Sequence, residues 1–425
     1  MLHNTHDLAG LLEHKEQTNP AWTVTHYLLQ NSSSFASQRT MLSSNSLLAA
    51  LFSGGTSAAT LYVSHYSGTI NTLNFNSNTL KLSSSTATGN GLPSWLTYDD
   101  AGKALYIADE TFYGASSGNL ASFSVDGNGA LNATGKGPTA LGVVATSLYG
   151  GTDGRSFIAN AHYQTSQIST FKLPLTGAQP LQTLKYTMSG PGRIPSRQDA
   201  PHPHHVFPDP TGDYLLVPDL GADLIRINRI ERSTGKLTEC GTGKPPPGTG
   251  PRHGAFWGTG ANTTLFLANE LSNSLSGWRV TYPSSSSGCM TLTLKDTLTP
   301  YQGNASAPYG TKVGEVHVKG NFVYISNRND KKFSSNDSIT QYTVSASGGI
   351  SWVDNTSSYG TYPRTFDINR AGDFAAVGDQ TTSNVAIVVR DVVTGKLGSM
   401  VASMRIGNSG TPENEDGLSA VVWAQ

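Results

Sequence analysis

Apolar and polar positions along the chain repeat one pattern seven times. A short apolar strand ends in Asp, Asn or a residue standing in for one, a polar turn follows, and a second strand with alternating apolar positions comes next. Successive copies begin 44 to 58 residues apart, at Leu61, Leu105, Phe157, Leu215, Leu265, Val323 and Ala375. Strand-only repeats of roughly 40–50 residues are typical of β-propeller blades. The pattern therefore predicts an all-β fold, a seven-bladed β-propeller.

The two ends of the repeat predict how the ring closes. The last segment, LSAVVWAQ from Leu418, is one strand with no partner after it, and the copy at Leu61 lacks the strand that should precede it. If these two segments pair in one blade, neither edge of the ring stays open. We therefore predict a propeller domain over residues 59–425 in which the N- and C-terminal strands complete one blade.

Composition narrows the class of partner. Of 425 residues, 37% are hydrophobic and only 13% are charged, and the formal net charge is −1. No basic field is present to recruit nucleic acid, and no apolar run is long enough to span a membrane. The sequence predicts a small-molecule partner and no cofactor, and it leaves the oligomeric state open.

Residues 1–58 form a predicted N-terminal extension, of which residues 1–40 carry no strand pattern. A second methionine, Met41, is followed by a short apolar run at 47–52 and by small residues at Thr56 and Ala58. This arrangement resembles a secretory signal cleaved after Ala58, with Met41 as the biological start. A disordered tail followed by a loop would look the same. Secretion is the favoured interpretation, and a cytoplasmic location is the alternative.

Two further features agree with a secreted protein. The only cysteines, Cys240 and Cys289, fall in neighbouring blades and form either an interblade disulfide in an oxidising compartment or two unrelated buried thiols. Sequons for N-linked glycosylation occur at Asn132, Asn262, Asn304, Asn336 and Asn355.

Four short motifs carry the most specific signal. The joint occurrence of HPHH, PDLGAD, PRH and NELSN resembles the seven-bladed lactonase family, which includes 6-phosphogluconolactonases and fungal carboxy-cis,cis-muconate lactonizing enzymes. The likeness runs from about residue 61 to 425 and is strongest over 202–280. It implies a metal-independent site at the channel mouth that makes or opens lactones. The implied catalytic group is His204 or His205, Arg252, Glu270 and Arg328.

The chemistry of lactone hydrolysis suits these side chains. A histidine that titrates near neutral pH can activate water, arginine can stabilise an oxyanion, and Glu270 can orient the histidine or donate a proton. Strand alternation places His204 and His205 on opposite faces, and we favour His204 in the channel together with Val206. Phe207 would then lie between blades with His205. Residues expected to contact substrate are His205, His253, Glu315, His317 and Arg364.

Three functions remain open at this point. The leading one is a secreted lactonase that hydrolyses an aldonolactone. The second is a 3-carboxy-cis,cis-muconate lactonizing enzyme, for which channel arginines are natural carboxylate partners. The third is a non-catalytic secreted or cell-wall glycoprotein, which we would favour if the His, Arg and Glu side chains failed to converge. A metal site at His202, His204 and His205 is disfavoured because alternation splits them between faces.

Overall fold

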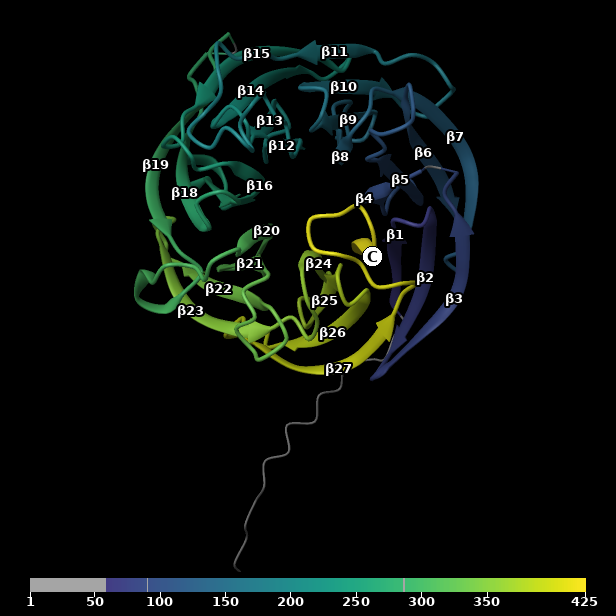
Figure 1. The fold of residues 1–425 in the computed structure, drawn as a ribbon. Coiled ribbons are helices and arrows are strands. Elements are labelled where there is room, and N and C mark those ends of the chain that lie inside the picture. The colour runs from purple at the N-terminus through teal and green to yellow at the C-terminus, as the bar shows by residue number, and fades with distance from the viewer. Residues whose placement is uncertain (1–58, 90, 286) are drawn as a thin grey trace, which may run out of the picture. The chain divides into compact units, whose positions relative to one another are not determined.

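The computed structural model describes residues 59–89, 91–285 and 287–425. In these ranges the chain forms seven four-stranded antiparallel sheets in a ring, with two single-turn 3₁₀ segments, η1 (Gly260–Asn262) and η2 (Gln302–Asn304) (Figure 1). The predicted seven-bladed propeller is confirmed. No helix in the described ranges is long and apolar enough to cross a membrane. The predicted extension and its cleavage site lie outside the described residues.

Each blade is a meander of four strands, and the blades are numbered 1 to 7 in chain order. Within a blade the strands are described from the axis outward. The innermost strands are β28 (Leu418–Ala424), β4 (Pro93–Asp99), β8 (Val143–Tyr149), β12 (Phe207–Pro208), β16 (Pro251–Trp257), β20 (Lys312–Lys319) and β24 (Pro363–Ile368). The second strands are β1 (Ala59–His65), β5 (Ala104–Asp109), β9 (Phe157–His162), β13 (Tyr214–Asp219), β17 (Thr264–Asn269), β21 (Phe322–Arg328) and β25 (Phe374–Asp379). The third strands are β2 (Thr69–Asn76), β6 (Gly118–Val125), β10 (Gln167–Lys172), β14 (Leu224–Glu231), β18 (Ser274–Thr281), β22 (Ser338–Val344) and β26 (Asn384–Arg390). The outermost strands are β3 (Thr79–Ala87), β7 (Leu131–Thr139), β11 (Gln182–Lys185), β15 (Lys236–Gly243), β19 (Thr291–Leu298), β23 (Ile350–Ser357) and β27 (Leu397–Arg405).

Blade 1 is completed by the two ends of the propeller, as predicted. Strand β28 pairs antiparallel with β1, in a register that runs from Thr60 opposite Ala424 to His65 opposite Leu418. The C-terminal strand thus takes the innermost place in a sheet whose other three strands come from the start of the domain. Closure in this way gives the inner edge of β1 a partner.

The hydrophobic core is divided among the interfaces between blades. Second strands are buried on both faces, as in β13, where Leu215 and Val217 pack toward blade 3 and Leu216 packs toward blade 5. The apolar side chains of β28 serve two interfaces, because Trp423 packs against blade 7 and Ala420 against blade 2. Such close packing holds each innermost strand at a fixed position around the axis.

One extra residue interrupts the inner pairing of every blade at the same place. In blade 5, Pro251 pairs with Asn269 and His253 with Ala268, so Arg252 is the extra residue of a β-bulge. Arg364 takes the same place in blade 7. The equivalent one-residue shifts lie at Ser94, Val144, Gly314 and Ser419, and between Pro203 and Phe207 in blade 4. A bulge re-aims its side chains, and bulges are common beside active sites.

The bulge faces a polar residue that is the last of each second strand, except in blade 6, where Asn327 is the last but one. These strand-end residues are His65, Asp109, His162, Asp219, Asn269, Asn327 and Asp379. The residue that follows each of them is, in blade order, Tyr66, Glu110, Tyr163, Leu220, Glu270, Arg328 and Gln380. Because the second strands all point the same way along the axis, these following residues gather at one end of the ring.

Candidate active site

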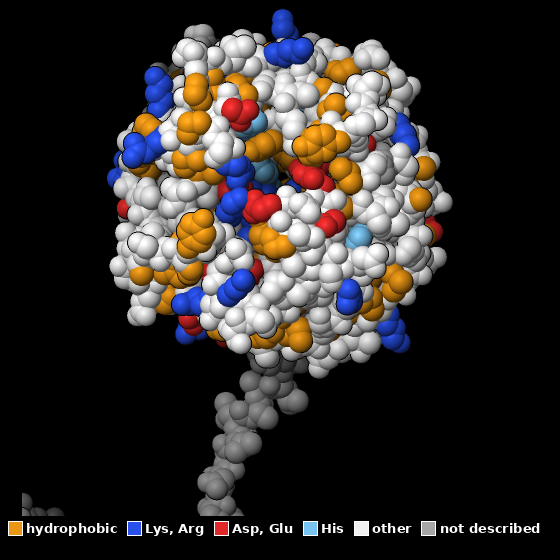
Figure 2. All heavy atoms as spheres, in the orientation of Figure 1, with side chains coloured by type: hydrophobic (Ala, Val, Ile, Leu, Met, Phe, Trp, Pro, Cys, Tyr) orange, Lys and Arg blue, Asp and Glu red, His pale blue; other side chains and the backbone are white. Residues whose placement is uncertain are grey.

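The sequence-predicted site residues come from equivalent positions in different blades. Arg252 and Arg364 are bulge residues, and His204 follows Pro203 at the matching place in blade 4. Glu270 directly follows Asn269, the last residue of β17, and Arg328 follows Asn327 as the last residue of β21. Figure 2 shows basic, acidic and histidine side chains together around a hollow in the middle of the face that it displays. The repeat therefore explains why residues far apart in the chain meet at one end of the ring.

Glu270 lies at the centre of an arginine cluster. Its Oε2 accepts hydrogen bonds from Arg252 Nε (3.0 Å) and Arg328 Nη2 (2.6 Å), and its Oε1 accepts one from Arg197 Nη2 (2.5 Å). Arg252 also donates to the Gly314 carbonyl at 3.0 Å. Side chains of Arg252, Glu270 and Arg328 are each no more than 5% exposed. One carboxylate thus holds three guanidinium groups in fixed orientations.

The charges of this cluster define what each group can do. Burial alone would raise the pKa of Glu270, but Arg328, Arg197 and Arg252 outweigh it and hold the pKa well below the usual range. Glu270 therefore stays a carboxylate and is no proton donor, and none of its hydrogen bonds goes to His204. This corrects the expectation that Glu270 orients the histidine or supplies a proton. Burial and the neighbouring Arg328 lower the pKa of Arg252 to about 10, so Arg252 remains charged at neutral pH.

Two guanidinium nitrogens of the cluster have no protein acceptor among the described residues. They are Nη2 of Arg252 and Nη1 of Arg328, whose other guanidinium nitrogens bind Glu270 and backbone carbonyls. Guanidinium groups held in this way are preorganised donors for an oxygen that gains negative charge. The cluster can therefore serve as an oxyanion-binding site.

A chain of hydrogen bonds links two histidines to a second glutamate. His204 Nδ1 lies 3.2 Å from His253 Nε2, and His253 Nδ1 lies 3.1 Å from Glu315 Oε1. All three side chains are buried. Burial, then the positive charge of Arg252, lower the pKa values of His204 and His253 well below the ordinary range, so both rings are neutral at neutral pH.

The predicted placement of the HPHH histidines is wrong in one respect. Only Phe207 and Pro208 form strand β12, so alternation does not separate His204 from His205. His205 stacks on His253 with ring centroids 4.5 Å apart, while His204 bonds to the same His253. Val206 is fully buried between blades 3 and 4 rather than facing the channel. Phe207 does pack between blades 4 and 5.

Arg364 forms a second charged group with residues that the sequence did not single out. Its Nη2 donates to Glu110 Oε2 at 3.1 Å, and Tyr66 Oη donates to the same oxygen at 2.5 Å. Glu110 and Tyr66 occupy the positions that correspond to Glu270 in blades 2 and 1. Comparison of strand ends between repeats would have found both. His317 stands apart, with Nδ1 4.0 Å from Asp367 Oδ1 and a third of its side chain exposed.

Arg197 is the most important residue that sequence reasoning missed. It belongs to residues 186–201 of the connection between β11 and β12, which precede the repeat position at Pro203 and His204. Besides Glu270, its Nη2 contacts Tyr163 Oη at 3.3 Å. The attraction of Glu270 raises the pKa of Arg197 above its ordinary value. The one signal in the sequence was the unusual length of this connection directly before HPHH.

A loop that joins blade 7 to blade 1 reaches across to blade 6. Residues 406–417 join β27 to β28 and cross the centre of the view in Figure 1. Glu413 in this loop accepts hydrogen bonds from Lys312 Nζ and Tyr362 Oη. The Arg328 guanidinium lies over the Tyr362 ring, with its Cζ 5.2 Å from the ring centroid. The loop therefore extends the charged site beyond the inner strands.

Other sequence-predicted features lie away from this cluster. Cys240 and Cys289 form a disulfide that joins blade 4 to the segment before β19 of blade 5. Among the sequons, Asn132, Asn262 and Asn304 are exposed and Asn336 is half-buried. Asn355 is buried, and its Nδ2 donates to the Pro300 carbonyl and Thr340 Oγ1, so this fold leaves it unavailable as a glycan acceptor.

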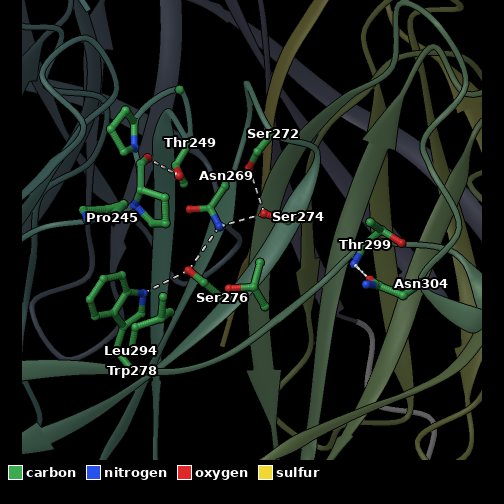
Figure 3. Close-up of a pocket in the computed structure, with 14 residues that line it drawn as sticks. Pro245, Thr249, Asn269, Ser272, Ser274, Ser276, Trp278, Leu294, Thr299 and Asn304 are labelled. Atoms are coloured by element: carbon green, nitrogen blue, oxygen red, sulfur yellow. Dashed lines mark hydrogen bonds between the residues drawn. The ribbon is translucent and has the colours of Figure 1, made fainter. Parts of the chain in front are cut away.

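A separate pocket of blade 5 supplies no acid or base. It is lined by Pro245, Thr249, Asn269, Ser272, Ser274, Ser276, Trp278, Leu294, Thr299, Asn304 and their neighbours (Figure 3). Asn269 Nδ2 donates to Ser274 and Ser276, and Ser276 accepts from Trp278 Nε1. Its lining contains no titratable side chain. This pocket therefore offers no side chain for acid–base catalysis.

Comparison with known proteins shows the family to which this chain is related. The model of the family described as "Lactonase, 7-bladed beta-propeller" matches residues 59–411. The chain belongs to this family. It is 30% identical over 317 residues to a probable 6-phosphogluconolactonase of Arthroderma benhamiae, covering 73% of this chain and 76% of that protein. It is 27% identical over 329 residues to a 6-phosphogluconolactonase of Formosa agariphila, covering 74% and 86%.

Solved structures show the same relationship. The periplasmic gluconolactonase of Pseudomonas aeruginosa superimposes with a TM-score of 0.71 at 25% identity, covering 86% of this chain and 99% of that one. A putative 6-phosphogluconolactonase of Bacteroides fragilis superimposes with a TM-score of 0.70 at 25% identity, covering 86% and 98%. Membership of this lactonase family confirms the expectation that the chain is an enzyme.

Proposed function

We propose that this propeller lactonase hydrolyses a sugar lactone at the end of the ring where the arginine cluster and the histidine chain meet. The observation that carries the proposal is the convergence of Arg197, Arg252 and Arg328 on Glu270 directly beside the histidines. Arg252 and His253 are consecutive residues, so one strand supplies both groups. The positive charge that hydrolysis requires is supplied by the guanidinium groups, without a metal ion.

In the proposed reaction the lactone carbonyl oxygen binds the free N–H groups of Arg252 and Arg328. His204 takes a proton from a water molecule, whose oxygen attacks the carbonyl carbon and forms a tetrahedral oxyanion. The carbonyl then reforms, the ring C–O bond breaks, and the leaving alkoxide oxygen receives the proton from His204. The product is the open hydroxy acid, and His204 returns to its neutral form.

We favour an uncharged aldonolactone over a phosphorylated one as the substrate. The related periplasmic enzyme of P. aeruginosa carries the name gluconolactonase, which supports an unphosphorylated substrate.

A substrate panel tests this function. Purified protein should hydrolyse gluconolactone and other aldonolactones with a higher kcat/KM than 6-phosphogluconolactone, and it should leave 3-carboxymuconate unchanged. Ring opening is followed by proton release in a weakly buffered assay, with the uncatalysed rate subtracted. A clear preference for the phosphorylated lactone would contradict the substrate assignment, and inactivity on all lactones would contradict the function.

We further propose that the protein works outside the cytoplasm. The disulfide between Cys240 and Cys289 supports this, because disulfides persist in oxidising compartments. Protein from culture medium should begin at Ala59 and carry glycans on some of the exposed sequons, as N-terminal sequencing and glycosidase treatment would reveal. An unglycosylated chain that is found only in the cytosol, with free thiols, would refute the proposal.

A further inference from the structure

We propose that His253 and Glu315 are positioning residues that fix His204 in the tautomer with the proton on Nδ1, leaving Nε2 unprotonated as the basic atom. This inference rests on the proposed function for its catalytic meaning, but the tautomer itself can be observed without any assay. It gives separate roles to residues that the sequence marked only as substrate contacts.

The direction of the hydrogen bonds follows from the chain of partners. His253 Nδ1 lies 3.1 Å from Oε1 and 3.0 Å from Oε2 of Glu315, and a carboxylate only accepts. His253 must therefore carry its proton on Nδ1, and in the neutral ring Nε2 then holds a lone pair. That lone pair lies 3.2 Å from His204 Nδ1, which must donate. The remaining nitrogen of His204, Nε2, is left as an acceptor.

The structure leaves this chain little freedom to rearrange. The backbone N–H of Glu315 donates to Ser326 Oγ at 2.9 Å, and the backbone N–H of Val316 donates to Glu315 Oε1 at 3.0 Å. The His253 side chain is 1% exposed and lies between Trp95 and His205, with ring centroids 5.0 and 4.5 Å away. No described residue other than His253 bonds His204 through its side chain. The proton positions are thus set by tertiary contacts.

The neighbouring His205 is assigned the opposite tautomer. The backbone N–H of Gly254 donates to His205 Nδ1 at 3.3 Å, so that nitrogen carries the lone pair and Nε2 carries the proton. Nε2 of His204 is therefore a hydrogen-bond acceptor, and Nε2 of His205 is a donor. In the proposed reaction His204 can accept the proton of water, while His205 can donate a hydrogen bond to a substrate oxygen.

Groups around His204 keep its ring neutral at neutral pH. The charged and titratable groups that face it are Arg252, His253, Glu270, Arg364 and Tyr163. Burial, followed by Arg252 and His253, lowers its pKa well below the ordinary value, while Glu270 opposes the shift. A fixed tautomer of the neutral ring is therefore what decides whether His204 can act as a base.

The first test reads the tautomers directly. In protein labelled with ¹⁵N in histidine, long-range ¹H–¹⁵N spectra at pH 7.5 should show His204 protonated on Nδ1 and His205 protonated on Nε2. Spectra of His204→Gln and His205→Gln assign the signals. A wild-type His204 protonated on Nε2 would overturn the inference, whatever the lactonase assay shows. The expected tautomers in an inactive protein would refute the proposed function and leave the positioning intact.

The second test removes the fixed acceptor. In Glu315→Gln the amide can donate or accept, so His253 no longer has one imposed tautomer. We expect kcat to fall by on the order of 10²–10⁴-fold with little change in KM, as loss of a tautomer-fixing carboxylate does in a catalytic triad. A second set of His204 signals should appear, while His205 keeps its own. Glu231→Gln, on the exposed end of β14, is the control and should match wild type.

A purely structural role for Glu315 predicts a different result. It would lower the melting temperature of Glu315→Gln and leave kcat and the His204 spectrum of the folded fraction unchanged, which would overturn the inference. If Glu315→Gln does not fold, the wild-type spectrum alone decides between the two tautomers.

Discussion

Replacing Arg252 by alanine is expected to lower kcat/KM by on the order of 10²–10³-fold, the effect of removing an oxyanion donor. The side chain contributes a free Nη2 and a charge that persists at neutral pH, since its pKa is about 10. The fold should survive, because Glu270 keeps Arg197 and Arg328 as partners when Arg252 is lost. Steady-state kinetics on the best aldonolactone, with thermal melting of the same samples, measure the two effects separately.

The pH dependence of Arg252→Ala provides a second signature. In the wild type the active form of His204 is neutral, and its lowered pKa places the acid limb of kcat/KM below pH 6.5. Removing the positive charge of Arg252 raises that pKa, so the limb should move toward higher pH in the variant. Arg390→Ala is a matched control, because Arg390 is also buried but bonds Tyr324 and the Gly372 carbonyl away from the site. Full activity of Arg252→Ala, or an unmoved acid limb, would contradict the assignment.

A chain that ends at Asp416 is expected to lose the folded state. It lacks β28, whose buried Leu418, Val421 and Trp423 pack against blade 7 and whose Ala420 packs against blade 2. Loss of one large buried side chain costs about 2–5 kcal/mol, and a domain is stable by about 5–15 kcal/mol in total. Removal of several such side chains, together with every hydrogen bond between β28 and β1, exceeds that margin.

Size-exclusion chromatography and circular dichroism measure this outcome. The truncated chain should aggregate or show no cooperative melting, because the inner edge of β1 loses its partner while its other edge stays paired with β2. A chain shortened only by Gln425 keeps every residue of β28 and should melt like the full chain. A monomeric truncated chain with an unchanged melting temperature would show that closure by β28 is not required.

The repeat explains why Arg252, Glu270 and Arg328 could be predicted from the sequence. Arg252 lies at the bulge of its blade, and Glu270 and Arg328 lie at the ends of second strands. Equivalent positions in different blades lie at the same end of the ring, so the repeat predicts that these three residues meet. The same logic applied to blades 1 and 2 would have added Tyr66 and Glu110. Alternation failed for HPHH because the bulge region is not a regular strand, and it left His204 and His205 against one side chain, His253.

The sequence by itself determined the number of blades, the closure of the ring and the positions at which chemistry can lie. Those features depend on local patterns, namely alternating apolar residues, polar strand ends and a repeat length that recurs along the chain. Only the tertiary structure decided which side chains share a proton or a charge. Arg197 reaches Glu270 from a connection outside the repeat, and Glu315 sets the tautomer of His204 through His253 in a different blade. Such pairings depend on how neighbouring blades are oriented around the axis, which no single segment of the sequence encodes.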